Sequence, residues 1–379
     1  MRRVLILGGG FGGVAAANRL RSLLPSEDEV LLADRRAHFI VGFRKTWALF
    51  GHSPLEAGFG RLLDLEKKGI RVIQGEITDL DPAARSADVE GRRLEADALV
   101  VALGAQLDPG AVPGFDDHAL NVYSAEGIPR AAEVLGSFRG GRVVVGIFGP
   151  VYKCPPAPYE IALLAKDFFE SRGISVSITV FTPQPMSMPI LGEAGCAVIE
   201  GRLAAREIRL LTQQRAIAVE PGRVRFAAHN PCPFDLLLGI PPHKVPDVVA
   251  QSGLTGGGEW VPVDARTLET RFPGVYAVGD VNAIPMANGK PLPKAGVFAE
   301  GEGFVVAERI AAVFAGRESQ ASFDGEGGCY LEVGGGEAMM VRGSFLAEPS
   351  PQVGLSEQSA AYVEDKRDFE RQRLETWFG

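Results

Sequence analysis

The hydrophobic positions of this chain fall into short continuous runs, separated by stretches with the composition of helices. The first two runs are Val4–Leu7 and Val30–Ala33, and the residues between them at 14–20 (VAAANRL) favour a helix. A later run, Arg142–Ile147 (RVVVGI), precedes a helical stretch that begins near Tyr159. Uninterrupted apolar runs are typical of parallel strands that are buried on both faces. Strands that alternate with helices in this way predict an α/β fold built from βαβ units.

The glycine-rich turn after the first run carries a specific motif. Gly8, Gly10 and Gly13 occupy the glycine positions of G-x-G-x-x-G, and Phe11 and Gly12 lie between them. Such glycines permit a tight turn, close approach of the backbone to a pyrophosphate and close packing of helix on strand. The N-terminus of the following helix offers N–H donors and a favourable dipole to phosphates. The motif therefore predicts a dinucleotide site.

An acidic residue follows the second apolar run, Val30–Ala33, at the position where a dinucleotide site needs a carboxylate. The carboxylate of Asp34 can bind both hydroxyls of a ribose. Arg35 and Arg36 follow directly. They either contact the cofactor, for example through a 2′-phosphate, or are solvated charges, and the sequence leaves both interpretations open.

Composition narrows the class of protein. A chain of 379 residues is long enough for two domains and an appendage, and its net charge of −8 argues against a nucleic-acid partner. No apolar stretch reaches the roughly 18 residues of a transmembrane helix. The chain enters a strand at once, which leaves no room for a signal peptide, so we expect a cytoplasmic protein. Four cysteines are too few for a disulfide scaffold.

Two later segments point to the cofactor. Leu99–Ala105 (LVVALGA) is an apolar run that ends in glycine, and residues 272–280 (FPGVYAVGD) end a strand in Gly-Asp. Together with the glycine-rich turn, they resemble the flavoproteins of the glutathione-reductase structural class. The resemblance implies two Rossmann-like dinucleotide-binding domains and an FAD cofactor. It places Ala102 and Gly104 near the hinge, and Gly279 and Asp280 at the ribityl chain and pyrophosphate of FAD.

These anchors divide the chain into three parts. We expect residues 1–110 and 255–320 to form the FAD-binding domain, and residues 111–254 a second Rossmann-like domain without a functional NAD site. We expect residues 321–379 to form a C-terminal region that carries Cys329. This region contains glycine, methionine and many charged residues.

The turn after Arg142–Ile147 departs from a nucleotide-binding turn. It reads GPVYKCPPAPYE at residues 149–160, with Tyr152, Lys153, Cys154 and four prolines where a pyridine-nucleotide domain has glycines. A thiol in place of a phosphate cradle indicates an electron donor that reacts with sulfur.

Three segments carry a closer resemblance: YKCPPAPYE around Cys154, FDLLLGIPPH at residues 234–243, and PKAGVFA at residues 293–299. They resemble the sulfide:quinone oxidoreductases and the related flavoprotein subunit of flavocytochrome c sulfide dehydrogenase. The resemblance implies an enzyme that oxidises hydrogen sulfide and passes electrons through FAD to a quinone or a cytochrome. It implies a second redox cysteine, Cys329, 175 residues after Cys154 (329 − 154), and a cation, Lys294, at the pyrimidine edge of the flavin.

The chemistry of these residue types fits that reaction. Hydrosulfide can open a Cys154–Cys329 disulfide by thiol–disulfide exchange. By resemblance, Cys154 then carries the persulfide and Cys329 is the partner nearer the flavin. Lys294 would stabilise the reduced, anionic flavin.

The chain also departs from the family. Many members have a third cysteine before the second domain, and residues 118–124 (HALNVYS) contain none. The flavocytochrome subunit binds FAD covalently through a cysteine after the second strand, and Ala37–Leu49 has none. We therefore expect non-covalent FAD and a mechanism with two cysteines.

The C-terminal region leaves several questions open. Residues 359–379 predict a helix with an apolar face, which either rests on the inner face of the cell membrane as a peripheral contact or packs against the protein or a homodimer partner. Met339, Met340, Phe345 and Leu346 either line a quinone pocket or fill a core.

Two rival functions remain. One is a type II NAD(P)H:quinone dehydrogenase, which the turn around Cys154 disfavours, and the other is a low-turnover flavin-binding redox sensor or interaction protein. We predict no metal site, because the five histidines and four cysteines lack ligand spacing. We expect Cys196 to pack within a helix and Cys232 to lie in a loop. The sequence assigns no role to His38, His118 or His243.

Overall fold

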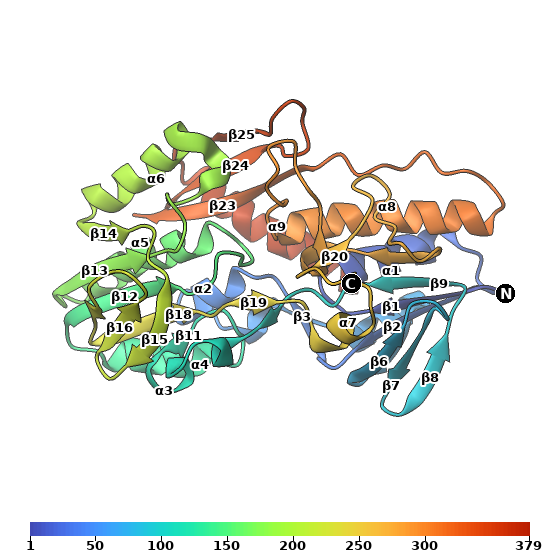
Figure 1. Ribbon diagram of the computed structural model, residues 1–379, viewed down its shortest axis with the longest axis horizontal. Helices are drawn as coiled ribbons and strands as arrows, with labels where there is room; N and C mark the ends of the chain where they lie inside the picture. The colour runs from blue at the N-terminus through green and yellow to red at the C-terminus, as the bar shows by residue number, and fades with distance from the viewer.

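The computed structural model describes residues 1–379, which form two lobes that each contain a five-stranded parallel sheet (Figure 1). The strands of the first sheet, in spatial order, are β21 (Val275–Ala277), β9 (Ala98–Val101), β1 (Arg3–Leu7), β2 (Glu29–Asp34) and β5 (Arg71–Gln74). Every pair of neighbours is parallel. The predicted α/β fold is therefore confirmed.

Both faces of the first sheet are covered, which explains its continuous apolar runs. Helices α1 (Phe11–Leu23) and α8 (Gly296–Phe314) lie on one face, and the antiparallel strands β6 (Ile77–Asp81), β7 (Ser86–Val89) and β8 (Arg92–Glu95) lie on the other. The two helices can pack closely because Gly303 has no side chain. A Cβ there would stand 2.5 Å from the carbonyl oxygen of Gly12.

The second lobe repeats this plan. Its sheet runs in the order β11 (Leu120–Asn121), β18 (Leu236–Ile240), β12 (Gly141–Ile147), β13 (Val176–Phe181) and β14 (Ile208–Leu211). The helices of this lobe are α4 (Ile128–Ser137), α5 (Ala157–Glu170) and α6 (Gly192–Ala205). A small antiparallel sheet packs against the other face through Val219, Val224 and Phe226, and its strands are β15 (Ala216–Glu220), β16 (Arg223–Phe226) and β17 (Cys232–Pro233).

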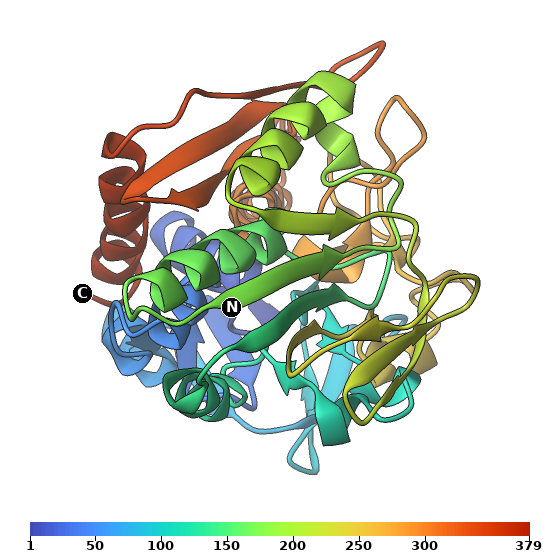
Figure 2. The same cartoon turned by 90° about the vertical axis from the view of Figure 1, so that its left-hand side faces the viewer.

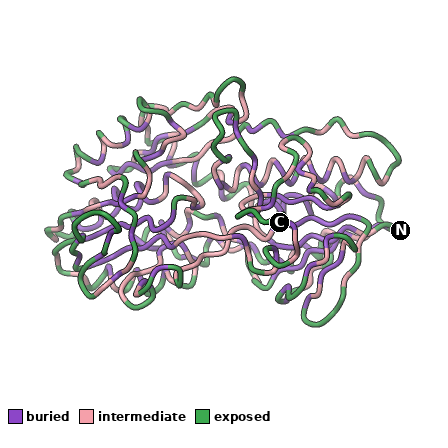
Figure 3. Tube along the Cα trace, viewed as in Figure 1, coloured by how far each residue is buried: buried purple, intermediate pink, exposed green.

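The chain crosses between the lobes twice, so the first lobe is discontinuous in sequence. The two crossings meet as an antiparallel pair, β10 (Gln106–Leu107) and β19 (His243–Lys244). Helix α7 (Asp247–Gln251) follows the second crossing. The buried parts of both lobes follow their central sheets (Figure 3). The remaining short elements are β3 (His38–Ile40), α2 (Arg44–Leu49), β4 (Phe59–Arg61), α3 (Phe115–His118), β20 (Val261–Pro262) and β22 (Asn282–Ala283).

The C-terminal region contains a sheet that the sequence pattern did not predict. Strands β23 (Glu326–Gly334), β24 (Glu337–Ser344) and β25 (Gln352–Leu355) form an antiparallel sheet, and helix α9 (Ala361–Phe378) follows (Figure 2). The three glycines 334–336 all have positive φ and form the β23–β24 turn. Strand β23 packs against α5 of the second lobe and α8 of the first, so this region joins the two lobes.

Helix α9 packs against the protein itself, which decides between the alternatives for its apolar face. The indole of Trp377 is 2% exposed and lies 5.7 Å from the ring of Phe11 and 5.3 Å from that of Phe39. The same side of the helix also buries Lys366 and Glu370, which the sequence pattern had not assigned to it. No helix in the structure has the length and hydropathy needed to span a bilayer.

Candidate active site

The glycine-rich turn between β1 and α1 has the conformation that a phosphate cradle requires. Gly8 has a φ of +108°, and a Cβ there would stand 2.3 Å from the carbonyl oxygen of Ala102. A Cβ at Gly13 would stand 1.8 Å from the carbonyl oxygen of Gly8. Nothing lies within 4 Å of a Cβ at Gly10, which precedes α1. The first and third glycines are thus required by packing, and the middle one borders open space at a helix N-terminus that suits a pyrophosphate.

Asp34 ends β2 and is held beside this turn. Its Oδ2 accepts hydrogen bonds from the backbone N–H of Gly9 at 2.6 Å and from the guanidinium of Arg36 at 2.6 Å. Burial acts to raise the pKa of Asp34, but the hydrogen bonds and charge of Arg36 outweigh it, so the pKa is lowered and the carboxylate is charged. Arg35, which the sequence suggested as a cofactor contact, is exposed and faces Glu76 at 3.5 Å.

The two downstream segments meet the first lobe at the same edge. Gly104 follows β9, with Ala102 packed on Gly8, and Gly279 and Asp280 follow β21. The backbone N–H of Gly279 donates to Glu302 at 2.6 Å. Because β1, β9 and β21 are parallel, these residues lie at the carboxyl edge of the sheet, where such folds bind ligands.

Lys294 is a buried cation next to that edge. Its ammonium group donates to the carbonyl oxygens of Asp280 at 2.6 Å and Asn282 at 3.1 Å, and lies 3.5 Å from the ring centroid of Trp260. Burial lowers the pKa of Lys294 to about 8, and the charges of Asp280 and Glu302 oppose that shift. The side chain is therefore mostly protonated at neutral pH. Sequence reasoning missed Trp260 and Glu302, which carry no local motif.

The turn between β12 and α5 rests directly on the Lys294 segment. The backbone N–H of Cys154 donates to the carbonyl oxygen of Lys294 at 2.8 Å. The carbonyl oxygen of Cys154 accepts from the N–H of Ala157 at 3.0 Å and the hydroxyl of Tyr123 at 3.3 Å. Cys154 has a φ of +56°, in the left-handed region. Burial raises the pKa of its thiol to about 11.

Cys329 lies on β23, paired with Val341 of β24. Burial raises the pKa of its thiol, and a charge on Cys154 raises it further. Strand β23 packs against α5, the helix that directly follows the Cys154 turn. Both cysteines are free thiols in the structure. Three separate parts of the chain therefore bring Cys154, Cys329 and Lys294 to one region.

A buried charged cluster adjoins the two thiols, and no pattern in the sequence indicated it. The ammonium group of Lys366 on α9 donates to Glu160 of α5 at 2.7 Å and to Glu332 of β23 at 2.8 Å. Glu332 also accepts from the indole of Trp47 at 2.6 Å. The charges of Glu160 and Lys366 act on the pKa of both cysteines, Glu160 raising it and Lys366 lowering it.

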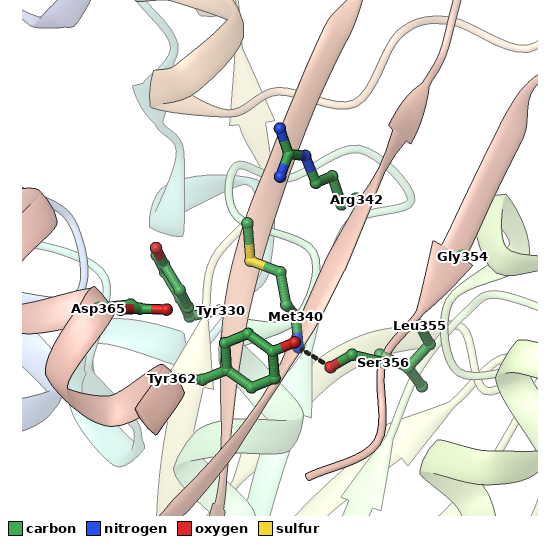
Figure 4. Close-up of a pocket in the computed structure, with 8 residues that line it drawn as sticks. All are labelled: Tyr330, Met340, Arg342, Gly354, Leu355, Ser356, Tyr362 and Asp365. Atoms are coloured by element: carbon green, nitrogen blue, oxygen red, sulfur yellow. Dashed lines mark hydrogen bonds between the residues drawn. The ribbon is translucent and has the colours of Figure 1, made fainter. Parts of the chain in front are cut away.

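A cavity of about 420 Å³ lies on the side of β23 that faces α9 (Figure 4). Its walls include the rings of Tyr330 and Tyr362 and the thioether of Met340, with Arg342 and Asp365 as charged groups. Tyr330 directly follows Cys329 in the strand, so their side chains point to opposite faces of the sheet. Met339 and Phe345 are instead buried in the core, and Leu346 packs against it.

The other candidate residues lie outside this region or are packed. Cys196 donates to the carbonyl oxygen of Met188 at 3.0 Å, and Cys232 is a buried residue of β17 in the small sheet of the second lobe. The ring of His38 stacks on Phe59, and His118 ends α3. The structure contains no group of three or more potential ligands that could hold a metal ion.

Comparisons with known proteins agree with this geometry. Residues 2–146 match the model of the pyridine nucleotide-disulphide oxidoreductase family. The mitochondrial sulfide:quinone oxidoreductase of Mus musculus is 21% identical over 91% of this chain and 79% of its own length. The sulfide-quinone reductase of Aquifex aeolicus is 28% identical over 82% of this chain and 76% of its own length.

Solved structures and a further relative extend the comparison. The X-ray structure of the Aquifex aeolicus sulfide:quinone oxidoreductase has the same fold, with a TM-score of 0.89 over 100% of this chain and 92% of that one at 24% identity. An alternative NAD(P)H-ubiquinone oxidoreductase of Arabidopsis thaliana is 28% identical over 77% of this chain and 63% of its own length. The residues at the glycine-rich turn, Asp34 and the Gly279–Asp280 edge suit a bound flavin dinucleotide. This chain is a flavoprotein oxidoreductase that is similar, over most of its length, to sulfide:quinone oxidoreductases.

Proposed function

We propose that this protein oxidises hydrogen sulfide through the Cys154/Cys329 pair and passes the electrons, through non-covalently bound FAD, to a quinone. The observation that supports this most strongly is the 2.8 Å hydrogen bond from Cys154 to the carbonyl of Lys294. It holds a thiol, rather than a nucleotide-binding turn, over the edge where the glycine-rich turn and Asp280 would place a flavin. Relatives named for sulfide and quinone support the choice of donor and acceptor.

FAD would extend along the carboxyl edge of the first sheet. The turn of Gly8, Gly10, Phe11, Gly12 and Gly13 would bind the pyrophosphate with backbone N–H groups, and Asp34 the ribose. Asp34 would have to release its contacts with Arg36 to do so, because the guanidinium donates hydrogen bonds to both of its carboxylate oxygens. No cysteine lies within residues 37–49, which supports non-covalent binding.

The ring end of the cofactor would lie between Lys294 and the two thiols. When bound, the flavin would serve as the acceptor of two electrons from a thiolate. The ammonium group of Lys294 would stabilise negative charge at the pyrimidine edge of the ring. Trp260 and the carbonyls of Asp280 and Asn282 hold that ammonium in place.

The reaction would begin from a Cys154–Cys329 disulfide. Hydrosulfide attacks Cys154, a new S–S bond forms there, the Cys154–Cys329 bond breaks, and Cys329 leaves as a thiolate. The negative charge passes from the donor to Cys329, where burial raises the pKa of the thiol and the charge of Lys366 opposes that rise. Cys154 retains the sulfur as a persulfide until a second nucleophile removes it.

The cavity beside Tyr330 would receive the acceptor. Its volume and its two phenol rings suit a planar quinone head group rather than a protein such as a cytochrome. A quinone acceptor requires contact with a membrane surface. The apolar side of α9 does not supply that contact, because it is packed against Phe11 and Phe39.

The related NAD(P)H dehydrogenases supply the main rival function. The turn after β12 is unsuited to a nucleotide pyrophosphate, because Tyr152 is buried in it and its prolines at 150, 155 and 156 have no backbone N–H to donate. An anaerobic titration that follows flavin absorbance separates the candidates. We expect bleaching by sulfide and none by NADH. Bleaching by NADH alone would contradict the proposal, and bleaching by neither would favour a sensor.

Substitution of each cysteine tests the thiol pair. Cys154→Ser and Cys329→Ser should each abolish bleaching by sulfide and retain bound FAD, measured by the flavin-to-protein absorbance ratio. Cys196→Ser serves as the control and should behave as the native protein, because Cys196 packs within the second lobe. Normal bleaching in either of the first two variants would remove the thiol-pair mechanism.

A further inference from the structure

His243 lies beside the Cys154 turn and has no part in the reaction described so far. It is on β19, opposite Leu107 of β10, and this pair continues the segment that follows Gly104. Its ring centroid is 5.9 Å from that of Tyr123, with the two planes at 88°. The hydroxyl of Tyr123 in turn donates to the carbonyl oxygen of Cys154. The imidazole is thus one side chain away from the backbone that positions the thiol.

The hydrogen bonding of the ring fixes where its proton lies. Nδ1 is 2.9 Å from the carbonyl oxygen of Pro241, which can only accept, so Nδ1 carries the proton. Burial and the charges of Lys153, Lys294 and Lys45 lower the pKa of His243 to about 3, so the ring is neutral. Nε2 therefore presents a lone pair.

That lone pair has no partner. Nε2 is buried, and no hydrogen-bond donor in the protein reaches it. Most buried polar atoms in native proteins are hydrogen-bonded, and one that is not costs free energy. A bound ligand with a hydrogen-bond donor could therefore supply the partner that Nε2 lacks in the protein.

A cation adjoins the same site. Lys153 directly precedes Cys154, and among the cations its charge acts most strongly on His243. Its ammonium group contacts the carbonyl oxygen of Ala105 at 3.5 Å and forms no ion pair with a carboxylate. Lys45, which is also near Cys154, has no ion pair either. Burial lowers the pKa of Lys153, and the charges of Asp280 and Glu126 oppose that shift without contacting its ammonium group. The site thus combines an unused acceptor with a cation that no carboxylate pairs directly.

We infer that His243 and Lys153 form the binding site for the hydrosulfide donor, which donates its S–H to Nε2 of His243 while its anionic sulfur faces the ammonium of Lys153. This inference rests on the proposed function. Hydrosulfide has one proton and one negative charge, and the site offers one acceptor and a cation. Its remaining sulfur lone pairs are free to attack Cys154, with the bond changes given above.

The test compares two nucleophiles that differ in their proton. Hydrosulfide carries an S–H, whereas fully ionised sulfite is also an anion that opens disulfides but carries no proton. His243→Phe keeps a ring against Tyr123 and removes the acceptor, and His243→Gln places an amide oxygen near the position of Nε2. Lys153→Met removes the charge. Stopped-flow flavin absorbance of each holoenzyme gives the concentration dependence for each nucleophile, and mass spectrometry gives the adduct on Cys154.

The expected results distinguish the contribution of the His243 acceptor from that of the Lys153 charge. His243→Phe should raise the sulfide concentration for half-maximal rate about tenfold, the effect of one hydrogen bond, and leave that for sulfite unchanged. His243→Gln should restore the sulfide response, and Lys153→Met should weaken both nucleophiles.

The failures are distinguishable. If sulfide does not bleach the native flavin, the proposed function is wrong. If it does, and His243→Phe with an unchanged melting temperature responds to sulfide as the native protein, only the role of His243 is wrong. Equal impairment of His243→Phe and His243→Gln towards both nucleophiles would show a packing role and overturn the inference.

Discussion

Cys154 adopts a backbone conformation that few side chains accept. A φ of +56° costs a residue with a Cβ about 1 kcal/mol or more relative to extended or helical backbone. The hydrogen bonds of its N–H to Lys294 and of its carbonyl to Ala157 and Tyr123 offset that cost. The orientation of this thiol therefore depends on contacts from both lobes.

The raised pKa of Cys154 predicts slow alkylation at neutral pH. Burial, with the charge of Glu160, raises the pKa of the thiol to about 11, and only the thiolate reacts. In reduced, flavin-free Cys329→Ser protein, the rate of reaction of Cys154 with iodoacetamide should rise about tenfold per pH unit from about pH 7 to 10. Peptide mapping would measure the rate, with glutathione as the control. A plateau near pH 8 would contradict the buried environment.

Glu302 predicts a pH dependence of stability. Burial raises its pKa to about 7, although Gly279 and Asn282 donate hydrogen bonds to it. Because the folded pKa is above the unfolded one, the folded state binds more protons between about pH 4.5 and 7. The contribution of Glu302 to stability is full below this window and is lost as the pH rises through it. Glu302→Gln, whose amide oxygen accepts the same bonds, should flatten the decline in melting temperature of flavin-free protein from about pH 5 to 8. An unchanged pH profile would assign that decline to other groups.

The inner face of helix α9 is partly charged. Lys366 is 1% exposed between Glu160 and Glu332, and Glu370 is paired with the buried Arg44. These pairs fix the helix against α2, α5 and β23. Its aromatic residues meet the first lobe through Phe11 and Phe39. An apolar face alone would not specify this position along the sheet.

Removal of the Lys366 charge should therefore destabilise the protein strongly. Lys366→Met leaves two carboxylates buried without a cation, which costs about 3–5 kcal/mol. Arg367→Met, on the exposed side of the same helix, should change stability by about 0.5 kcal/mol or less. Urea unfolding of both variants measures the difference. Similar midpoints for the two would show that the cluster contributes little.

At the scale of the whole molecule, the candidate site exists only where three parts meet. Cys154 comes from the second lobe, Lys294 from the first, and Cys329 from the C-terminal sheet that joins them. The packing of β23 against α5 therefore sets the distance between the thiols.

Oxidation of the thiol pair should stabilise the molecule as a whole. A disulfide across 175 residues (329 − 154) removes unfolded-state entropy worth about 5 kcal/mol in the chain-entropy model. The oxidised protein should melt several degrees above the reduced one, measured by calorimetry without flavin. The difference should vanish in Cys329→Ser and persist in Cys196→Ser. Equal melting temperatures in both redox states of the native protein would argue against a Cys154–Cys329 disulfide.

Local patterns predicted the α/β fold and the glycine-rich turn correctly, because strand, turn and helix are neighbours in sequence. The same patterns missed the sheet β23–β25, whose glycine-rich strands lack a clear alternation. They also missed the Lys366 cluster, since Lys366 and Glu160 are 206 positions apart and each resembles an ordinary helix charge. The roles given to Cys154, Cys329 and Lys294 stay predictions until the experiments above are done.

The sequence by itself determined the α/β fold with its glycine-rich turn, and a thiol in the turn where a second phosphate cradle would lie. Both follow from residues within a few positions of one another, whose backbone requirements are local. Only the tertiary structure decided that Cys154 hydrogen-bonds to the Lys294 segment, that α9 is packed inward, and that His243 keeps a free lone pair. Those features depend on burial and on partners far along the chain, and a pattern of neighbouring residues contains neither.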